Sequence, residues 1–153
     1  MQLKECYEST KAILASQKSN IRFINVPPLG SYKPLTDIKA DWVVAAPENV
    51  GDCSAVAWYF AHFIQENLGV PVGIINASFG GSIVETWMSR ETCQTLGDIS
   101  VPEVSDGNTR GEANIPTTMY NGTLNPNVGY CLTGCIRYQG KSTAEYVTQY
   151  SNS

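Results

Sequence analysis

The chain has 153 residues, 42 % of them hydrophobic, and a formal net charge of −4 at pH 7. This length predicts a single globular domain over residues 1–153, and the acidic balance without a lysine or arginine cluster argues against nucleic acid or an anionic membrane as a partner. The longest apolar stretch, residues 70–79, is about half of the ~20 residues that a membrane-spanning helix needs, so we expect no such helix and a neutral or small-molecule partner.

The first half of the chain predicts a helix, a strand and a second helix. Residues 3–17 have a rough helical period, and an alternating strand pattern follows from Ile21. Prolines and Gly30 predict a surface loop over residues 27–39, with a short extended segment at 41–45. The strongest helix is predicted up to Leu68, with Gly69 ending it. Its start is capped by Asp52 or Ser54, and its apolar residues at helical spacing are Val56, Phe60, Phe63, Ile64 and Leu68.

The second half begins with the clearest strand. Residues 70–78 are almost continuously apolar and β-branched, which is typical of a strand buried on both faces of a parallel sheet. Two short helices are predicted at 83–88 and 89–96, an exposed polar insertion at 100–116, and a second strand at 132–138 before a helix at 142–151. Alternating strands and helices indicate the α/β class.

The five cysteines form an odd set without a C-x-x-C spacing, which predicts neither a zinc site nor a disulfide framework. We expect free thiols packed as small hydrophobic side chains. Residues 1–6 lack the apolar core of an export signal, and the cellular compartment is not predicted.

Two glycine-containing turns follow the predicted strands, at residues 78–82 and 138–142. Ligands bind at the carboxyl ends of strands in open parallel sheets. At the first turn, Gly80 and Gly81 let backbone N–H groups approach a developing oxyanion, and at the second turn Gln139 offers a side-chain amide donor. Taken without any resemblance, the glycines are better explained by a tight turn between strand and helix.

Four blocks of the sequence, in the expected order, resemble the sialate O-acetylesterase family. They lie at residues 42–61, 70–87, 119–126 and 134–142, and include the runs Cys53-Ser54-Ala55-Val56-Ala57-Trp58, Asn76-Ala77-Ser78-Phe79-Gly80-Gly81-Ser82-Ile83-Val84-Glu85-Thr86-Trp87, Met119-Tyr120-Asn121-Gly122-Thr123 and Tyr138-Gln139-Gly140-Lys141-Ser142. The resemblance implies a three-layer α/β/α sandwich of the SGNH hydrolase type, with a mostly parallel sheet that is incomplete here.

The resemblance also implies a reaction and a set of site residues. Such enzymes remove acetyl groups from sialic acid or other acetylated sugars, using a serine nucleophile and a histidine base, and no metal or organic cofactor. The oxyanion and pocket residues carried over by position are Gly80, Gly81 and Gln139. The residues expected at the sugar are Ser82, Glu85, Trp87 and Tyr138.

The family's serine lies in a Gly-Gln-Ser-Asn-Met motif and its histidine in an Asp-x-x-His-like segment, and neither is present. Met1-Gln2 resembles the end of the serine motif, so we expect an interior portion of such an enzyme that is inactive by itself. The one histidine, His62, falls inside the predicted helix and is not expected to act as a base. A pairing of serine with Lys141 is chemically allowed, but no spacing requires it.

The last block departs from the family's Trp-Tyr-Gln-Gly-Glu-Ser-Asn form. Arg137, Lys141 and Thr143 replace the tryptophan, glutamate and asparagine, and Lys141 reverses the local charge. Two alternatives to a dissected esterase therefore stay open: a carbohydrate-binding protein without catalysis, and a decayed remnant. A sheet without its neighbouring strand would also expose an edge, which predicts self-association there.

Overall fold

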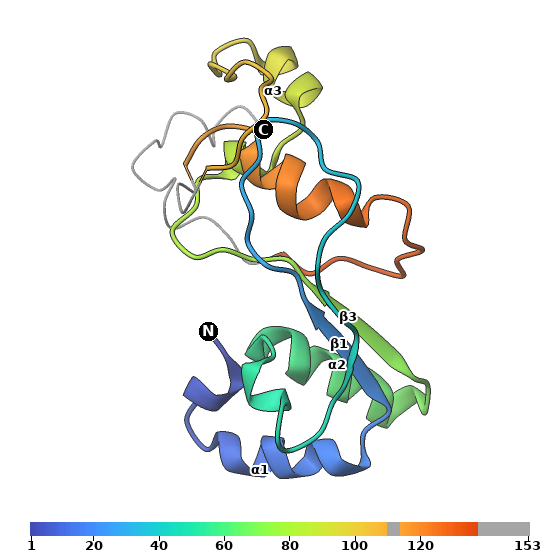
Figure 1. Cartoon of the computed structure of the whole chain (residues 1–153). Coiled ribbons are helices and arrows are strands. Elements are labelled where there is room, and N and C mark those ends of the chain that lie inside the picture. Colours follow the sequence, from blue (N-terminus) through green and yellow to red (C-terminus); the bar gives the residue numbers. More distant parts are fainter. Residues whose placement is uncertain (110–113, 138–153) are drawn as a thin grey trace. The chain divides into compact units, whose positions relative to one another are not determined.

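The computed structural model describes residues 1–109 and 114–137 (Figure 1). The chain divides into two compact units. The first comprises residues 1–26 and 39–76, and the second comprises residues 27–38 and 77–153. Within the described ranges no helix is long and apolar enough to cross a membrane.

A small mixed sheet forms the centre of the first unit. Its strand order is β2-β1-β3, with β1 at Ile21–Asn25, β2 at Val43–Val44 and β3 at Val72–Asn76. Strand β1 runs parallel to β3 (Figure 1) and pairs antiparallel with β2. These strands confirm the extended segments predicted near Ile21, at 41–45 and at 70–78, and with the helices they confirm the α/β class. The expected burial of the last strand on both faces is wrong, because β3 lies at the edge of the described sheet and only its Ile74 is buried.

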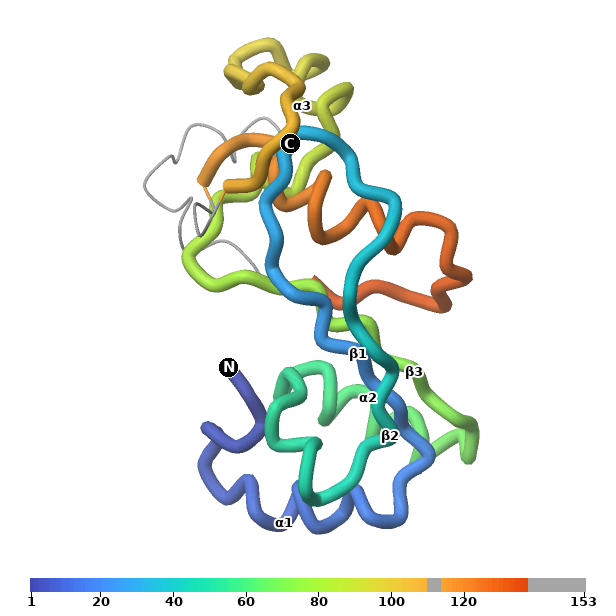
Figure 2. Tube along the Cα trace, in the orientation of Figure 1, coloured from blue at the N-terminus to red at the C-terminus, as the bar shows by residue number. Residues whose placement is uncertain are grey.

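The helices of the first unit are only partly those predicted. Helix α2 covers Ala55–Leu68 and ends at Gly69, whose φ of 66° is left-handed, as a glycine at this position allows. The helix predicted at 3–17 is instead three pieces, namely the 3₁₀ turn η1 at Leu3–Glu5, helix α1 at Ser9–Ala15 and the 3₁₀ turn η2 at Ser16–Lys18. The break falls at Glu8, whose φ of 54° cannot continue a helix. Figure 2 shows the path of the chain from β1 through β2 and α2 to β3.

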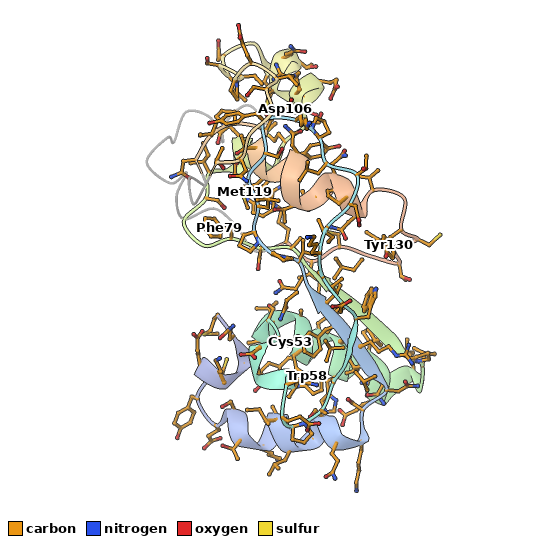
Figure 3. All side chains as sticks on the ribbon, in the orientation of Figure 1. Cys53, Trp58, Phe79, Asp106, Met119 and Tyr130 are labelled. Carbon is orange, nitrogen blue, oxygen red and sulfur yellow. The ribbon has the colours of Figure 1, made fainter. Side chains whose placement is uncertain are left out.

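One hydrophobic core holds the helices to the sheet. The sheet contributes Ile21, Phe23 and Ile74, which lie on one face because alternate strand residues point the same way. Helix α2 contributes Ala55, Trp58 and Ala61, and Trp58 (labelled in Figure 3) is fully buried. The apolar residues from which the helix was predicted do not belong to this core. Val56, Phe60 and Phe63 are exposed instead.

The second unit has short helices and much irregular chain. The predicted helices at 83–88 and 89–96 are confirmed as the 3₁₀ turn η4 at Val84–Trp87 and helix α3 at Arg90–Leu96. A π-helical segment, η5, covers Tyr120–Leu124, and the 3₁₀ turn η6 covers Asn125–Asn127.

The second predicted strand is wrong over its described part. Residues 132–137 form no strand and are exposed, because a strand is stable only when a neighbour pairs with its backbone, and no described strand does so. Tyr138 and the helix predicted at 142–151 lie outside the described residues.

All five cysteines lie in the described ranges and are free thiols. Cys53 and Cys93 are buried, as predicted, and burial raises the pKa of the Cys53 thiol to about 11. Cys131 and Cys135 are exposed, so the expectation of packed thiols is wrong for this pair. They belong to the same irregular segment that lacks a partner strand.

Gly122 packs against the backbone of a distant segment. A Cβ atom at this position would lie 1.9 Å from the carbonyl oxygen of Leu29. The neighbouring Thr123 hydroxyl accepts a bond from the Leu29 N–H at 3.0 Å and donates to its carbonyl at 3.1 Å. Only glycine therefore allows η5 to lie this close to residue 29.

The substitution Gly122→Ala is expected to lower the free energy of unfolding by about 2–3 kcal/mol, because backbone must move to admit the methyl group. Gly134→Ala is the matched control, since no atom of the described residues beyond its chain neighbours lies within 4 Å of a Cβ there. Urea unfolding of both variants provides the comparison, and equal midpoints would contradict the close packing of η5.

Candidate functional site

The glycine turn predicted as an oxyanion site follows β3 directly. Gly80 and Gly81 are both exposed, and among residues 1–109 and 114–137 no atom beyond the adjacent residues lies within 4 Å of a Cβ built at either one. Gly81 has a φ of 77°, so this residue also serves the tight turn that was the competing explanation. The space at Gly80 is not required by packing, and the backbone of the turn is open to a ligand. Phe79, labelled in Figure 3, precedes the two glycines.

Ser82 connects this turn to Trp87. Its buried hydroxyl donates to the carbonyl oxygen of Phe79 at 2.8 Å and accepts from the indole Nε1–H of Trp87, also at 2.8 Å. The indole ring of Trp87 is therefore fixed relative to the glycine turn. Trp87 itself stays partly exposed. Two residues expected at the sugar, Ser82 and Trp87, thus form one hydrogen-bonded unit, in which Ser82 orients the aromatic ring.

Glu85 has a buried carboxylate oxygen, Oε2, without a hydrogen-bond partner among the described residues. Its carbonyl oxygen accepts from the N–H of Thr117 at 2.9 Å. Thr117 is fully buried, its hydroxyl also has no partner in the described ranges, and its φ is 68°. A β-branched residue in this left-handed region is strained, and strain of this kind concentrates at functional sites. Both unpaired oxygens are buried away from solvent, so neither is presented to a ligand in this arrangement.

Thr86, between Glu85 and Trp87, anchors the turn η4 through buried hydrogen bonds. Its fully buried hydroxyl lies 3.2 Å from that of Thr118 and accepts from the N–H of Met119 at 3.2 Å. The Thr118 hydroxyl donates in turn to the carbonyl oxygen of Ile115 at 2.9 Å. These contacts fasten η4 to residues 115–119, so the side chains on either side of Thr86 have a fixed base.

Cys93 of α3 packs behind Glu85. Its sulfur lies 3.8 Å from the Glu85 carbonyl oxygen. Burial raises the pKa of this thiol, and the negative charge of Glu85 raises it further. Cys93 is thus a protonated, inert part of the support under the site.

The sequence reasoning missed the three threonines Thr86, Thr117 and Thr118. The available signal was their position, because Thr86 lies inside the block ending at Trp87 and the other two directly precede the block starting at Met119. The structure brings Gly80, Gly81, Ser82, Glu85 and Trp87 into one continuous segment. Gln139, Tyr138, Lys141 and Thr143 lie outside the described residues, and Arg137 is exposed.

His62 is engaged within α2, where the sequence placed it. Its imidazole stacks on the ring of Trp58, with centroids 5.5 Å apart and 10° between the planes, and its Nε2 lies 3.3 Å from a carboxylate oxygen of Glu66. Ser54 occupies the N-cap position of α2 but makes no capping bond with its side chain, so the predicted hydroxyl cap is wrong. Its backbone is held by a bridge to Gln2 instead.

Comparisons with known proteins agree with this arrangement. No protein-family model matches the chain. A carbohydrate acetylesterase from Xanthomonas citri has a similar structure, with a TM-score of 0.80 and 29 % identity over 98 % of this chain and 33 % of that one. The chain is thus similar to carbohydrate acetylesterases in fold and sequence.

The curated relatives make the similarity more specific. Sialate O-acetylesterase of Homo sapiens is 27 % identical over 141 residues, which cover 87 % of this chain and 27 % of the human protein. The Mus musculus enzyme of the same name is 27 % identical over 144 residues. The resemblance to sialate O-acetylesterases is therefore confirmed. The chain spans about a quarter of the length of these relatives.

Replacing Ser82 by alanine is expected to release the Trp87 ring, because the indole loses its acceptor and the Phe79 carbonyl its donor. The free energy of unfolding should fall by about 1–3 kcal/mol. Hydrogen exchange of the Trp87 indole N–H, followed by NMR, should accelerate, whereas that of the buried Trp58 indole should not. Ser105→Ala, at an exposed serine, is the control; unchanged Trp87 exchange in Ser82→Ala would contradict the orienting role.

Proposed function

We propose that this chain carries the oxyanion turn and part of the sugar-contacting surface of a carbohydrate O-acetylesterase, which removes acetyl groups from sialic acid or related sugars. The observation that carries the proposal is the exposed, unobstructed Gly80-Gly81 turn directly after β3, in a chain similar to such esterases. The fold we propose is the three-layer α/β/α sandwich of SGNH hydrolases, of which β1, β3 and the helices packed on them form one part.

The proposed chemistry is acyl transfer from a sugar hydroxyl to a serine. Attack on the ester carbonyl places negative charge on its oxygen, and donors already aimed at that oxygen lower the barrier. We assign the backbone N–H groups of Gly80 and Gly81 as such donors, because both residues are exposed and no described atom beyond the adjacent residues lies within 4 Å of a Cβ built at either one. The side-chain amide of Gln139 supplies another by its position in the sequence. The reaction needs no cofactor.

The sugar side of the proposed site lies along η4. Trp87 offers a partly exposed aromatic face, held in orientation by Ser82, on which a sugar ring can stack. Glu85 is proposed as a sugar contact from its position in the sequence; because its Oε2 atom is buried and has no hydrogen-bond partner among the described residues, this contact requires the side chain to turn outward. Tyr138 is proposed as a second aromatic contact from the sequence.

The chain by itself is proposed to lack esterase activity. It contains a single histidine, and His62 is occupied by Trp58 and Glu66 within α2. The same observation favours one second candidate function, a carbohydrate-binding protein that does not catalyse hydrolysis. Self-association through the sheet edge, where β3 pairs only with β1 in the described sheet, stays a prediction.

Titration with O-acetylated sialic acid in a calorimeter tests the proposed site. Binding is expected for the wild-type chain, with at least a tenfold weaker Kd in Trp87→Ala and in Glu85→Ala. Trp42→Ala, which removes another exposed tryptophan, is the control and should bind as wild type. No binding by the wild type, or an equal loss in the control, would overturn the sugar-contacting role of η4.

Hydrolysis of p-nitrophenyl acetate tests the chemistry. The chain is expected to release p-nitrophenol no faster than the double variant Gly80→Ala/Gly81→Ala, because its one histidine, His62, stacks on Trp58 and contacts Glu66 inside α2. A rate clearly above background that falls in the double variant would show that the chain is an active esterase and would refute its proposed inactivity.

A further inference from the structure

Residues 29–35 lie against η5 and η6, the blue and orange segments of Figure 1. No helix or strand covers this segment, so its buried backbone groups need partners elsewhere. Side chains two residues apart on η5 and η6 supply them. Three carbonyl oxygens of the segment accept bonds in this way: Leu29 from Thr123 at 3.1 Å, Ser31 from Asn121 at 3.1 Å, and Leu35 from Asn125 at 2.9 Å.

Asn121 holds segment 29–35 at two places. Its Nδ2 atom donates to the carbonyl oxygen of Ser31, and its own carbonyl oxygen accepts from the N–H of Leu35 at 2.9 Å. The residue is only 4 % exposed, so water does not compete for these bonds. The N–H of Asn121 donates to the carbonyl oxygen of Thr117 at 2.9 Å. Asn121 therefore connects segment 29–35 with the residues directly before η5.

Thr118 carries this connection on to the turn η4. Its carbonyl oxygen accepts from the N–H of Ser31 at 2.9 Å, and its hydroxyl lies 3.2 Å from that of Thr86. The N–H of Met119 donates to the same Thr86 hydroxyl. Thr118 thus contacts segment 29–35 through its backbone and η4 through its side chain, and both contacts are buried.

Thr117 shows that the connection is maintained at a cost in backbone strain. Its φ of 68° is unfavourable for a β-branched residue. Its N–H donates to the carbonyl oxygen of Glu85, and its carbonyl oxygen accepts from Asn121, so the residue is held from η4 and from η5. A strained conformation persists only where the surrounding structure determines it this fully. The π-helical form of η5 is rare as well, and such turns are frequent at functional sites.

We propose that Asn121 is a positioning residue for the sugar-contacting turn η4 and acts on Trp87 through Thr118. Without its Nδ2 atom, a buried carbonyl oxygen of segment 29–35 loses its donor, and the same segment carries the N–H that is bonded to Thr118. The inference rests on the proposed function, because it takes Trp87 as a sugar contact. It gives a role to the sequence block at 119–126, which supplies no group to the sugar itself.

Hydrogen exchange followed by NMR tests the proposal. In Asn121→Ala, the Trp87 indole N–H and the Met119 backbone N–H should each exchange about tenfold faster than in the wild type, because η4 then opens more readily. The Cys93 N–H, bonded inside α3 of the same unit, reports on unfolding of the whole unit and should keep its wild-type rate. Equal acceleration of all three groups would show that Asn121 only stabilises the unit and would overturn its positioning role.

Asn127→Ala is the matched control. The Nδ2 atom of Asn127 also donates to a backbone carbonyl oxygen in this unit, that of Thr123 at 2.8 Å, but not to segment 29–35. Its removal should leave the exchange of the Trp87 indole unchanged. Acceleration equal to that in Asn121→Ala would contradict the specific connection through Asn121.

Asn121→Asp tests whether the donated bond itself is responsible. A charged carboxylate has no proton for the Ser31 carbonyl oxygen, whereas a protonated carboxyl group has one, and burial raises the pKa of the introduced group. Relative to the wild type at the same pH, exchange of the Trp87 indole should be faster near pH 7 and return to the wild-type rate at about pH 4. A difference from the wild type that is the same at both pH values would refute the role of the donor.

Calorimetry with O-acetylated sialic acid connects the inference with the site. Asn121→Ala should bind about fivefold more weakly than the wild type, because ordering the released Trp87 ring then opposes binding, and Asn127→Ala should bind as the wild type. An unchanged Kd in Asn121→Ala would overturn the positioning role. A wild-type chain that binds no sugar would overturn the proposed function instead, and the exchange rates would still decide whether Asn121 fixes Trp87.

Discussion

The candidate site depends on the burial of a few hydroxyl groups beneath it. A hydroxyl taken out of water must find a partner or cost free energy, and Thr86 meets this requirement through the Thr118 hydroxyl and the Met119 N–H. These bonds join η4 to a segment about thirty residues later in the chain. Because Glu85 and Trp87 flank Thr86 on the same short 3₁₀ turn, the position of both side chains follows from this buried contact.

Two other residues of the same unit have polar atoms without a hydrogen-bond partner in the described ranges, and one of them also has a strained backbone. Thr117 holds a left-handed φ with a β-branched side chain and an unpaired hydroxyl, and Glu85 keeps one buried carboxylate oxygen unpaired within the described residues. The nearby Gly80-Gly81 turn leaves its backbone uncovered. The two unpaired oxygens are buried, whereas the glycine turn is the part of this segment that faces solvent.

Helix α2 of the first unit has apolar residues both on its buried side and on its exposed side. Trp58 fills the core because an alanine lies on each side of it, at positions i−3 and i+3, and lets α2 approach the sheet closely. That choice turns Tyr59, Phe60 and Phe63 outward. Their exposure follows from the burial of Trp58, because the two opposite sides of one helix cannot both face the same core.

The sequence by itself determined the features that depend on neighbouring residues. The apolar run at 70–78 specified β3, Gly69 specified the end of α2, and the glycines after β3 specified an open turn, because each follows from local backbone preferences. The tertiary structure alone decided which side of α2 is buried, that residues 132–137 pair with no described strand, and that Thr86 meets Thr118. These outcomes depend on contacts between residues far apart in the chain, which local periodicity does not encode.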